Sequence, residues 1–411
     1  KDVVHVLKRG LLRCFLRDRI TDKLIKSWRT ARKNKSSKKN LGLADGVNLI
    51  GYLQAAKGIS EAARSNLLAI GAAKIPCAAV NYDAGVSPSL KTEPVPPALY
   101  LNKFIFHTNI IHINPPQLPD LWKKFKKKDL IGRYTIGVWY WELPNFPEEW
   151  RFAFDLVDEV WVASQFVFDS VSAVSTVPVI KIPPCVEVES KCDMSRLDFG
   201  LPSDAFLFLC SYDVLSVQKR KNPESAIEAF KRAFLMDDLS VGLVIKVNNA
   251  QEKPEEIKEI KNKMRGYLNY YILDEIFERA KMNELLNLID AYISLHRSEG
   301  FGLVPAEAMF LGKPVVMTKW SGNVDFMTKN NSCGVDFKFI PVGSGASPYD
   351  ANQVWAEPDI AHAAEYLKQL AVDTAYYQGI SLEASKTIKE RFSPAKTGFL
   401  IRKRLSELKL I

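Results

Sequence analysis

Short apolar segments alternate with amphipathic helical segments along most of this chain, and this alternation constrains the fold more than any other feature. One run extends from residue 47 to residue 182, and a second begins at residue 206 after a turn-rich stretch at 187–200. Such alternation is typical of parallel sheets that helices cover on both faces. In a chain of 411 residues, two runs predict two doubly wound, Rossmann-like α/β domains.

The expected strands fix where a ligand would bind. They cover 47–52, 77–81, 110–113, 134–139, 159–163 and 179–182 in the first run, and 206–211, 241–247, 271–273, 291–295 and 314–318 in the second. The last segment, 395–411, is expected to form a charge-rich amphipathic helix. Ligands of such domains lie at the carboxyl ends of the strands, so the site is expected in a central cleft between the domains.

The positive charge of the chain is concentrated at one end. Residues 1–39 hold 14 Lys or Arg against 3 Asp, whereas the whole chain has a net charge of +9, so the rest is slightly acidic. Leu12, Phe15, Leu16 and Trp28 recur among these cations at near-helical spacing. This pattern is typical of a basic amphipathic helix on an anionic membrane surface. The alternative is an ordinary packed helix followed by a solvated tail.

A second cluster, residues 121–128, interleaves one Trp and one Phe with five Lys. Aromatic and cationic side chains together suit the headgroup boundary of a membrane. They could also suit nucleic acid, but no nucleic-acid-binding motif accompanies them, so we expect no nucleic-acid partner.

The cellular setting is expected to be cytoplasmic, with the protein peripheral on the inner face of the membrane. No stretch approaches the about 20 apolar residues that a membrane span needs. The six Cys show no CxxC pair, which is typical of reduced thiols.

The segment from Arg297 to residue 315, RSEGFGLVPAEAMFLGKPV, carries the strongest chemical signal. A strand leads into a glycine-bearing loop and then a helix, for which Pro305 suits the first position. Free amides near Gly302, Leu303 and Val304 would bind an anion. The carboxylates of Glu299 and Glu307 beside this anion site suit sugar or ribose hydroxyls. The alternative is that one Glu caps the helix and the other is solvated.

A second anion signal is the run KRKNPE at 219–224. Asn222 is a good N-cap and Pro223 a good first helical residue, and Arg220 and Lys221 lie just before this helix start. They form a candidate diphosphate clamp, to which Lys246, at the end of another strand, could add a third cation. The alternative is a solvated basic turn.

The first half carries weaker signals. Gly58 lies in a loop after the first strand, and Ser60 could cap a helix starting at Glu61. The glycine spacing is not that of a dinucleotide fingerprint. The stretch GVWYWELP, which contains Glu142, places aromatic side chains at a strand end, where they either stack on sugar rings or pack in the core. His107 and His112 are expected to be structural.

The Glu299–Glu307 segment resembles the Glu-x7-Glu signature of family 4 retaining glycosyltransferases, which have the GT-B fold. The resemblance extends over about residues 47–392 and includes GISE from Gly58, HIN from His112, WELP around Glu142, DEVWVAS before residue 165, RKNP from Arg220 and SGNVDF after residue 320.

The resemblance implies a role for each matching residue. Glu299 would hold hydroxyls of the transferred sugar, and Glu307 the donor ribose. The amides of Leu303 and Val304 would bind the diphosphate, while Lys221 and Arg220 would neutralise it as it leaves. Gly58 would let the first-domain loop approach the donor phosphates.

The resemblance also implies a domain plan and a reaction. The plan is a basic segment 1–42, an acceptor domain 43–190 to which 395–411 returns, and a donor domain 191–394. The reaction is transfer of a hexose, mannose being our first expectation, from GDP-mannose or a UDP-hexose to a glycan or lipid-linked acceptor in polysaccharide or glycolipid synthesis. No metal is expected, because cations and helix ends replace it.

The chain departs from the family at two points. The usual Gly-Arg after the first strand of the second domain is Tyr212-Asp213, which gives more weight to Arg220. The usual first-domain histidine has no counterpart, and Glu142 or an aromatic side chain could replace it. Two alternatives remain: another GT-B-like enzyme, such as an inverting transferase or an epimerase, and a non-catalytic nucleotide-sugar-binding protein at the membrane.

Overall fold

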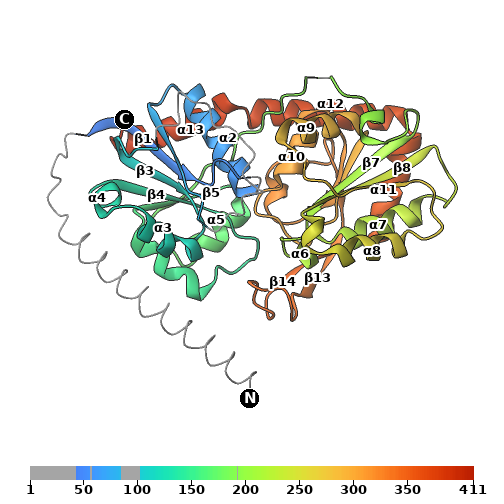
Figure 1. Ribbon diagram of the computed structural model, residues 1–411, viewed down its shortest axis with the longest axis horizontal. Coiled ribbons are helices and arrows are strands. Elements are labelled where there is room, and N and C mark those ends of the chain that lie inside the picture. The colour runs from blue at the N-terminus through green and yellow to red at the C-terminus, as the bar shows by residue number, and fades with distance from the viewer. Residues whose placement is uncertain (1–42, 56–57, 85–101, 192) are drawn as a thin grey trace, which may run out of the picture.

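The computed structural model describes residues 43–55, 58–84, 102–191 and 193–411, and its described part is built on two parallel sheets that lie side by side (Figure 1). The strand orders are β2-β1-β3-β4-β5-β6 and β12-β11-β10-β7-β8-β9. Every strand pair within these two six-stranded sheets is parallel. The prediction of two doubly wound, Rossmann-like α/β domains is confirmed.

The first sheet and its helices precede residue 182. Their elements are β1 (Ala44–Gly51), α2 (Gly58–Ala72), β2 (Cys77–Asn81), β3 (Phe106–His112), α3 (Leu118–Lys124), α4 (Lys127–Leu130), β4 (Tyr134–Trp139), β5 (Glu159–Val162), α5 (Gln165–Ser172) and β6 (Val179–Lys181), with 3-10 turns at Pro115–Gln117 and Glu148–Leu156.

The second sheet and its helices follow residue 195. Their elements are β7 (Phe206–Asp213), α6 (Gln218–Lys221), α7 (Pro223–Ala233), β8 (Val241–Asn248), α8 (Pro254–Lys263), β9 (Tyr270–Leu273), α9 (Arg279–Leu288), β10 (Ala291–Ser294), α10 (Leu303–Phe310), β11 (Val315–Thr318), β12 (Cys333–Val335), the antiparallel pair β13 (Phe337–Pro341) and β14 (Val354–Pro358), α11 (Ile360–Val372), α12 (Thr374–Arg391) and α13 (Pro394–Glu407), with 3-10 turns at Arg196–Phe199, Ala250–Glu252 and Gly322–Asp325.

Each expected strand overlaps a strand of the structure, but three strands were not expected. They are β12, β13 and β14. The strand β12 has only three residues. The β13–β14 hairpin is partly exposed and is joined through a Gly- and Pro-bearing connection, so it lacks the long apolar run of a buried parallel strand.

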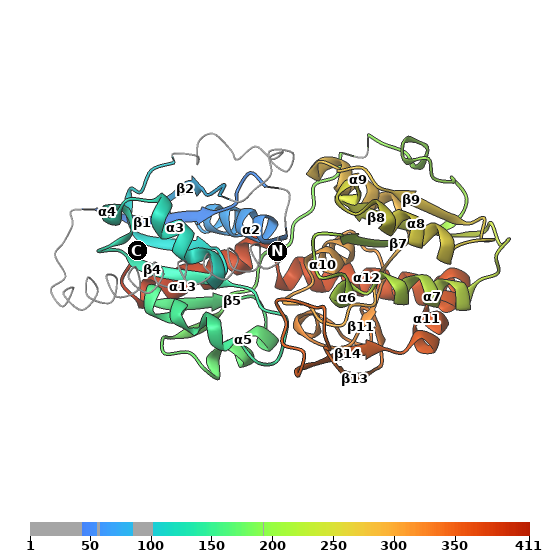
Figure 2. The same cartoon turned by 60° about the horizontal axis from the view of Figure 1, so that its bottom comes forward.

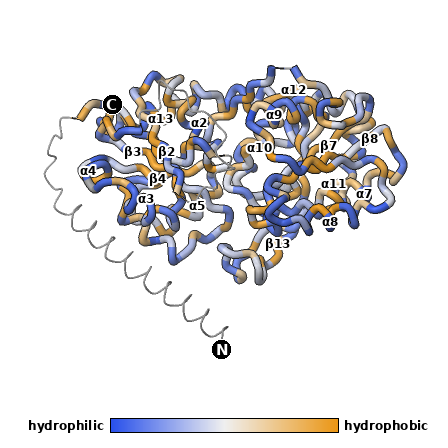
Figure 3. Tube along the Cα trace, viewed as in Figure 1, coloured by the Kyte–Doolittle hydropathy of each residue, from blue (hydrophilic) through white to orange (hydrophobic). Residues whose placement is uncertain are grey.

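Buried strands of branched and aromatic side chains form the core of each sheet. Seven of the eight residues of β8 are buried, as expected for a central strand covered by helices on both faces. Figure 3 shows hydrophobic colour concentrated along such inner strands, for example β7. The strands therefore form a rigid frame, and the loops at their carboxyl ends are left to carry polar side chains.

The last helix packs on the first domain, far from its neighbours in sequence. Figure 1 shows α12 and α13 running along one side of the molecule from the second sheet to the first. Ile401 and Leu405 of α13 are buried in the core that contains Leu49 and Trp161. Arg404 donates to Glu159, which is fully buried, over 3.1 Å to Oε1 and 3.0 Å to Oε2. This ion pair and the apolar contacts fix the chain end to the first sheet.

The β13–β14 hairpin of the second domain packs against the first domain. Its residues Val342, Ala346 and Trp355 are buried in the same core cluster as Trp139 and Trp141 of the first domain. Asn145 and Gln353 exchange hydrogen bonds of 2.9 Å and 3.2 Å across the boundary. Figure 2 shows the hairpin near β11 on the side turned towards the viewer. The contact holds the two sheets in one arrangement.

In the 121–128 cluster Trp122 is buried and Phe125 is half-buried, which favours packing over membrane contact for these two aromatic side chains. Trp122 is 6% exposed and lies in the first-domain core. Phe125 packs edge-on against Phe104, with ring centroids 5.0 Å apart. The aromatic spacing thus reflects core packing. Residues 1–42, on which the rest of the membrane prediction falls, lie outside the described residues, and no helix among the described residues is long and apolar enough to cross a bilayer.

Candidate functional site

The sheet topology places two polar loops at one point of the second domain. From β7 the chain proceeds outward through β8 and β9, and then returns to form β10 on the other side of β7. Crevices at such reversals, outside the carboxyl ends of the strands, are the usual ligand sites of doubly wound sheets. Helix α6 follows β7, and the loop 295–302 follows β10. Arg220 and Lys221 lie in α6, and Glu299 lies in the loop.

Glu299 is the centre of this cluster. Its Oε1 lies 2.6 Å from Lys221 Nζ and 3.1 Å from Arg220 Nη1. Burial alone would raise the pKa of the Glu299 carboxyl, but Lys221 and Arg220 outweigh it and lower that pKa to about 2. The carboxylate is therefore ionised at neutral pH and forms an ion pair with each cation. An incoming anion would compete with Glu299 for Lys221 and Arg220.

Arg220 is buried, and its guanidinium is incompletely paired. Its Nη1 also donates to the backbone oxygen of Ser298 over 2.8 Å, whereas its Nε has no hydrogen-bond partner among the described residues. Burial opposes the charge on Arg220, but Tyr349, Glu299 and Glu142 raise its pKa. The residue thus stays cationic although it is buried.

Asn222 holds the two loops together in a way that the sequence did not indicate. Asn222 takes the predicted N-cap position of α7. Asn222 has a left-handed backbone, with φ of 52°, and makes no side-chain cap bond. Its Nδ2 instead donates to the backbone oxygen of Leu295 over 3.0 Å. Pro223 does take the expected first helical position.

Helix α10 begins two residues earlier than expected. Gly302 precedes the helix with φ of 91°, a value that favours glycine. Leu303 and Val304 are the first helical residues, so Pro305 is third, not first. Amides in the first turn have no acceptor within their own helix. The amides of Leu303 and Val304 thus lie at a helix start directly after the Glu299 loop.

Gly322 lets a second loop approach this one. A side-chain Cβ at Gly322 would collide with the backbone oxygen of Gly300. The hydroxyl of Ser321 accepts a hydrogen bond from the backbone amide of Glu299 over 2.8 Å. The backbone amide of Gly322 donates to the backbone oxygen of Glu299 over 2.9 Å. The backbone around Glu299 is therefore fixed from both sides.

Glu307 is buried and paired with a cation that sequence reasoning missed. Arg279, the first residue of α9, donates from Nη2 over 2.6 Å and from Nη1 over 3.2 Å to the two carboxylate oxygens. Burial raises the pKa of Glu307, and Arg279 opposes that shift. Arg279 Nε also lies 3.9 Å from Glu61 of the first domain. No feature of the sequence around Arg279 marks it as part of a site.

Lys246 makes its contacts on the other side of β7. Its Nζ donates to Asn248 Oδ1 and to the Glu275 backbone oxygen, each over 2.6 Å, and lies 4.5 Å from the centre of the Phe277 ring. Burial lowers the pKa of Lys246 to about 8. Within the described residues it forms no ion pair with Glu299, so its contribution to a diphosphate clamp stays a prediction.

On the first-domain side, Gly58 and Ser60 lie within α2. The helix begins at Gly58, so the prediction that Ser60 caps a helix starting at Glu61 is wrong. The Ser60 hydroxyl is buried without a partner among the described residues. A Cβ at Gly58 would contact nothing within 4 Å. The structure therefore shows no steric need for glycine at position 58. The approach of Gly58 to donor phosphates stays a prediction.

The aromatic strand end contributes mainly to the core. Trp139 and Trp141 are 0% and 1% exposed, which favours the packing alternative for them. His112 is also buried, and burial lowers its pKa to about 3, so it is neutral. Glu142 differs, because its Oε2 accepts from the hydroxyl of Tyr349 over 3.0 Å. Tyr349 is a second site residue that the sequence analysis missed.

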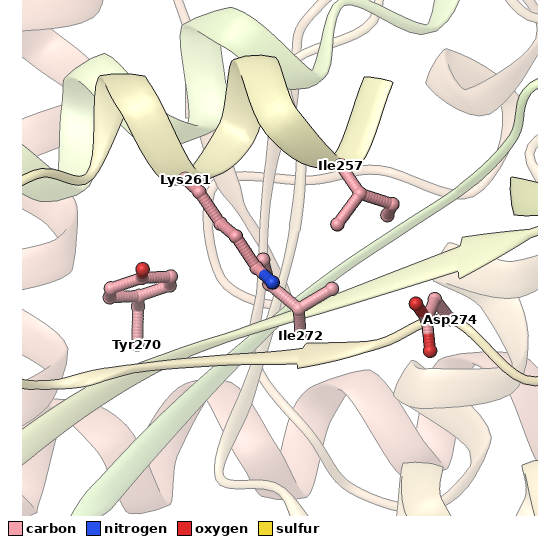
Figure 4. A pocket seen from close by; sticks show the side chains of 5 residues that line it. All are labelled: Ile257, Lys261, Tyr270, Ile272 and Asp274. Carbon is pink, nitrogen blue, oxygen red and sulfur yellow. The ribbon is translucent and has the colours of Figure 1, made fainter. Parts of the chain in front are cut away.

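A surface hollow lies apart from this cluster. This hollow, between α8 and β9, is lined by Ile257, Lys261, Tyr270, Ile272 and Asp274 (Figure 4), and no predicted site residue lines it. In the described part of the chain, no group of three or more His, Cys, Asp or Glu side chains is placed to hold a metal ion.

Two facing Rossmann-like domains with polar loops at the strand ends define the GT-B fold, and the comparisons agree. The chain is 15% identical to the HepE protein of Anabaena, solved with UDP-glucose, over 89% of this chain and 100% of that one, with a TM-score of 0.62. Sucrose-phosphate synthase from Thermosynechococcus elongatus is 14% identical over 89% and 99%, with a TM-score of 0.61. A glycosyltransferase from Rickettsia africae is 14% identical over 88% and 98%, also with 0.61.

Part of the second domain also matches a family model. Residues 208–339 match the family model described as glycosyl transferases group 1. The matched stretch includes Arg220, Lys221, Glu299 and Glu307. No curated protein matches the sequence of this chain.

Proposed function

We propose that this chain is a retaining glycosyltransferase that moves a hexose from a nucleoside-diphosphate sugar to an acceptor hydroxyl. The observation that carries the proposal is the contact of Arg220 and Lys221 with Glu299 at the chain reversal of the second sheet. Two cations and one carboxylate at a ligand crevice suit a sugar diphosphate, in which an anion adjoins neutral hydroxyls. The group 1 match over the same residues supports it.

Each part of the donor has a partner in the proposed site. Lys221 and Arg220 bind the diphosphate, together with the amides of Leu303 and Val304 at the start of α10. Glu299, released from its ion pairs, accepts hydrogen bonds from hydroxyls of the transferred sugar.

The nucleoside lies on the opposite side of the same helix start. Glu307 exchanges part of its contact with Arg279 for the ribose hydroxyls, and Gly302 leaves room at the helix start. Gly58 contributes from the first domain.

The donor is proposed to be a UDP-hexose. Solved structures of similar fold hold UDP with glucose, or UDP-glucose. None of the comparisons described above names a GDP-mannose donor, so mannose remains only the expectation from the resemblance. Mannose and glucose differ in the configuration of one hydroxyl group. The hydrogen bonds of Glu299 to the sugar hydroxyls would select the transferred hexose.

The proposed reaction proceeds on one face of the sugar. The acceptor hydroxyl oxygen forms the new bond to the anomeric carbon on the side from which the diphosphate departs. The bond from that carbon to the diphosphate oxygen breaks, and its electron pair stays with the diphosphate. The acceptor proton passes to a diphosphate oxygen. Lys221, Arg220 and the start of α10 stabilise the added negative charge.

The acceptor is proposed to be a glycan or lipid-linked sugar used in polysaccharide or glycolipid synthesis. The basic residues within 1–42 would hold the protein at an anionic membrane surface, on the cytoplasmic side, where a lipid-linked acceptor is accessible. This part rests on the sequence of that segment and on the resemblance.

Substitution of Lys221 and Glu299 tests the assignment. Lys221→Ala and Glu299→Ala are each expected to lower the rate of UDP release from UDP-glucose by ~10²–10³, comparable with the loss of one oxyanion donor. The measurement is a coupled assay of UDP release. The anomeric configuration of the product separates the retaining reaction from an inverting one.

Lys231→Ala is a matched control, because the half-buried Lys231 lies in the last turn of α7, at the opposite end of the helix from Lys221, and pairs with the exposed Glu228. It should retain the activity of the unsubstituted chain. Near-normal rates in both site variants would end the assignment. Binding of UDP-glucose without UDP release would favour the non-catalytic binding protein.

A further inference from the structure

Glu142 of the first domain lies beside the Glu299 cluster of the second. The residue follows β4, and its backbone oxygen accepts a hydrogen bond from the Ser298 hydroxyl. A Cβ at Gly300 would lie 3.3 Å from the backbone oxygen of Trp141. The segment 140–142 therefore contacts the loop that carries Glu299, and it does so from the opposite domain.

The carboxylate of Glu142 is held by a tyrosine of the β13–β14 connection. The hydroxyl of Tyr349 donates to Glu142 Oε2 over 3.0 Å. Burial, and the charge of Glu142, raise the pKa of Tyr349 despite the opposing effect of Arg220, so the hydroxyl keeps its proton. The ring lies 5.3 Å from Trp141 and 6.3 Å from Trp355, between centroids. Tyr349 is thus locked by the hairpin that joins the two domains.

Glu142 and Glu299 act on Arg220 from different domains. Both carboxylates raise the pKa of Arg220, which is 6% exposed and whose Nε has no hydrogen-bond partner in the described part of the chain. Glu299 forms ion pairs with both cations, whereas Glu142 has a neutral tyrosine as its hydrogen-bond donor. A carboxylate held mainly by one neutral donor retains acceptor capacity for a further hydroxyl.

We propose that Glu142 binds a hydroxyl of the acceptor sugar, and that Tyr349 is the positioning residue that orients the Glu142 carboxylate. The proposal rests on the transferase function proposed above. An ionised carboxylate accepts hydrogen bonds and repels phosphate. The acceptor therefore presents neutral sugar hydroxyls at the first-domain side of the cluster, and any phosphate that it carries lies away from Glu142.

Acceptor kinetics test this proposal. UDP release from UDP-glucose is measured with water as the only acceptor, and again with methyl α-glucoside, methyl α-mannoside and methyl α-galactoside. For the most effective glycoside, Glu142→Gln is expected to lower kcat/KM about tenfold and Glu142→Ala about a hundredfold, as for loss of a charge-assisted hydrogen bond. UDP affinity should stay within about twofold, because the proposed contact is with the acceptor and not with the donor.

Tyr349→Phe separates positioning from packing. It keeps the ring contacts and removes only the hydroxyl, so kcat/KM for the glycoside is expected to fall about three- to tenfold, mainly through KM. Glu149→Gln, at an exposed carboxylate of the following 3-10 turn, is the control and should behave as wild type. Thermal unfolding of all variants confirms that they fold.

The outcomes are distinct. Unchanged glycoside kinetics in Glu142→Gln would overturn the proposal, and so would a loss of UDP affinity, which would assign Glu142 to the donor. A wild type whose UDP release no glycoside increases would contradict a sugar-hydroxyl acceptor. A wild type that releases no UDP at all would instead contradict the transferase function, and the acceptor role of Glu142 with it.

Discussion

At the scale of single residues, the site is defined by how buried charges compensate one another. Glu299 is ionised because Lys221 and Arg220 outweigh the cost of its burial. Glu307 has the opposite shift, because burial dominates over its pairing with Arg279. Two glutamates eight positions apart therefore have different electrostatic environments, which suits different ligand groups.

The pH dependence of stability should report the Glu299 ion pairs. Its folded pKa of about 2 lies below the ordinary value of 4.5. The stabilisation is therefore fully present above about pH 4.5 and is lost as the pH falls towards about 2. Glu299→Gln should lower the free energy of unfolding by about 2–3 kcal/mol at neutral pH, and this difference from wild type should shrink in acid.

Urea unfolding of both chains between about pH 7 and about pH 3 measures this difference. Comparing two chains removes the contributions of other carboxyls, such as Glu307, that are common to both. A difference that does not change with pH would show that Glu299 gains no stability from its cations.

At the scale of elements, the packing of α13 on the first domain depends on a close helix crossing. A Cβ at Gly398 of α13 would collide with the backbone oxygen of Ala69 in α2, and would lie 3.0 Å from Ala73 Cβ. Backbone atoms of a packed helix cannot yield as a flexible side chain can. Glycine is therefore required here for contact, although it weakens the helix itself.

Two glycine substitutions should have opposite effects. Gly398→Ala is expected to destabilise the fold by about 1–3 kcal/mol, because α13 must move away from α2. Gly379→Ala, in α12, adds a Cβ that contacts nothing within 4 Å and should stabilise by about 0.5–1 kcal/mol through helix propensity.

Denaturant unfolding of the two variants gives both values, with Gly379→Ala as the matched control for Gly398→Ala. Equal changes in the two variants would mean that helix propensity alone acts at Gly398, and that the crossing is not close.

Much of the second-domain site follows from the sequence, because the carboxyl ends of parallel strands meet at one edge of a sheet. Arg220, Lys221 and Glu299 could be predicted as neighbours on that basis. Tyr349 and Arg279 could not, since they come from an irregular connection and a helix start whose positions depend on tertiary packing. Asn222 takes its predicted N-cap position, but the bond of its side chain to the Leu295 backbone oxygen depends on tertiary packing and could not be predicted.

At the scale of the whole molecule, the domains meet through the hairpin, through α13 and through polar contacts at the crevice. Ser164 of the first domain donates to the Gly300 oxygen over 2.7 Å, and the Gln165 amide donates to Asp325 over 3.0 Å. The aromatic contacts among Trp141, Tyr349 and Trp355 also hold the hairpin against the first domain. These contacts hold the two halves of the proposed site together.

A crystal structure of the chain with UDP tests the central claim most directly. The account predicts diphosphate oxygens within about 2.7–3.2 Å of Lys221 Nζ and of the amides of Leu303 and Val304, with the ribose at Glu307. Lys221 should have left Glu299, whose carboxylate then faces the position of the sugar. UDP bound elsewhere, with the Lys221–Glu299 ion pair intact, would contradict the account.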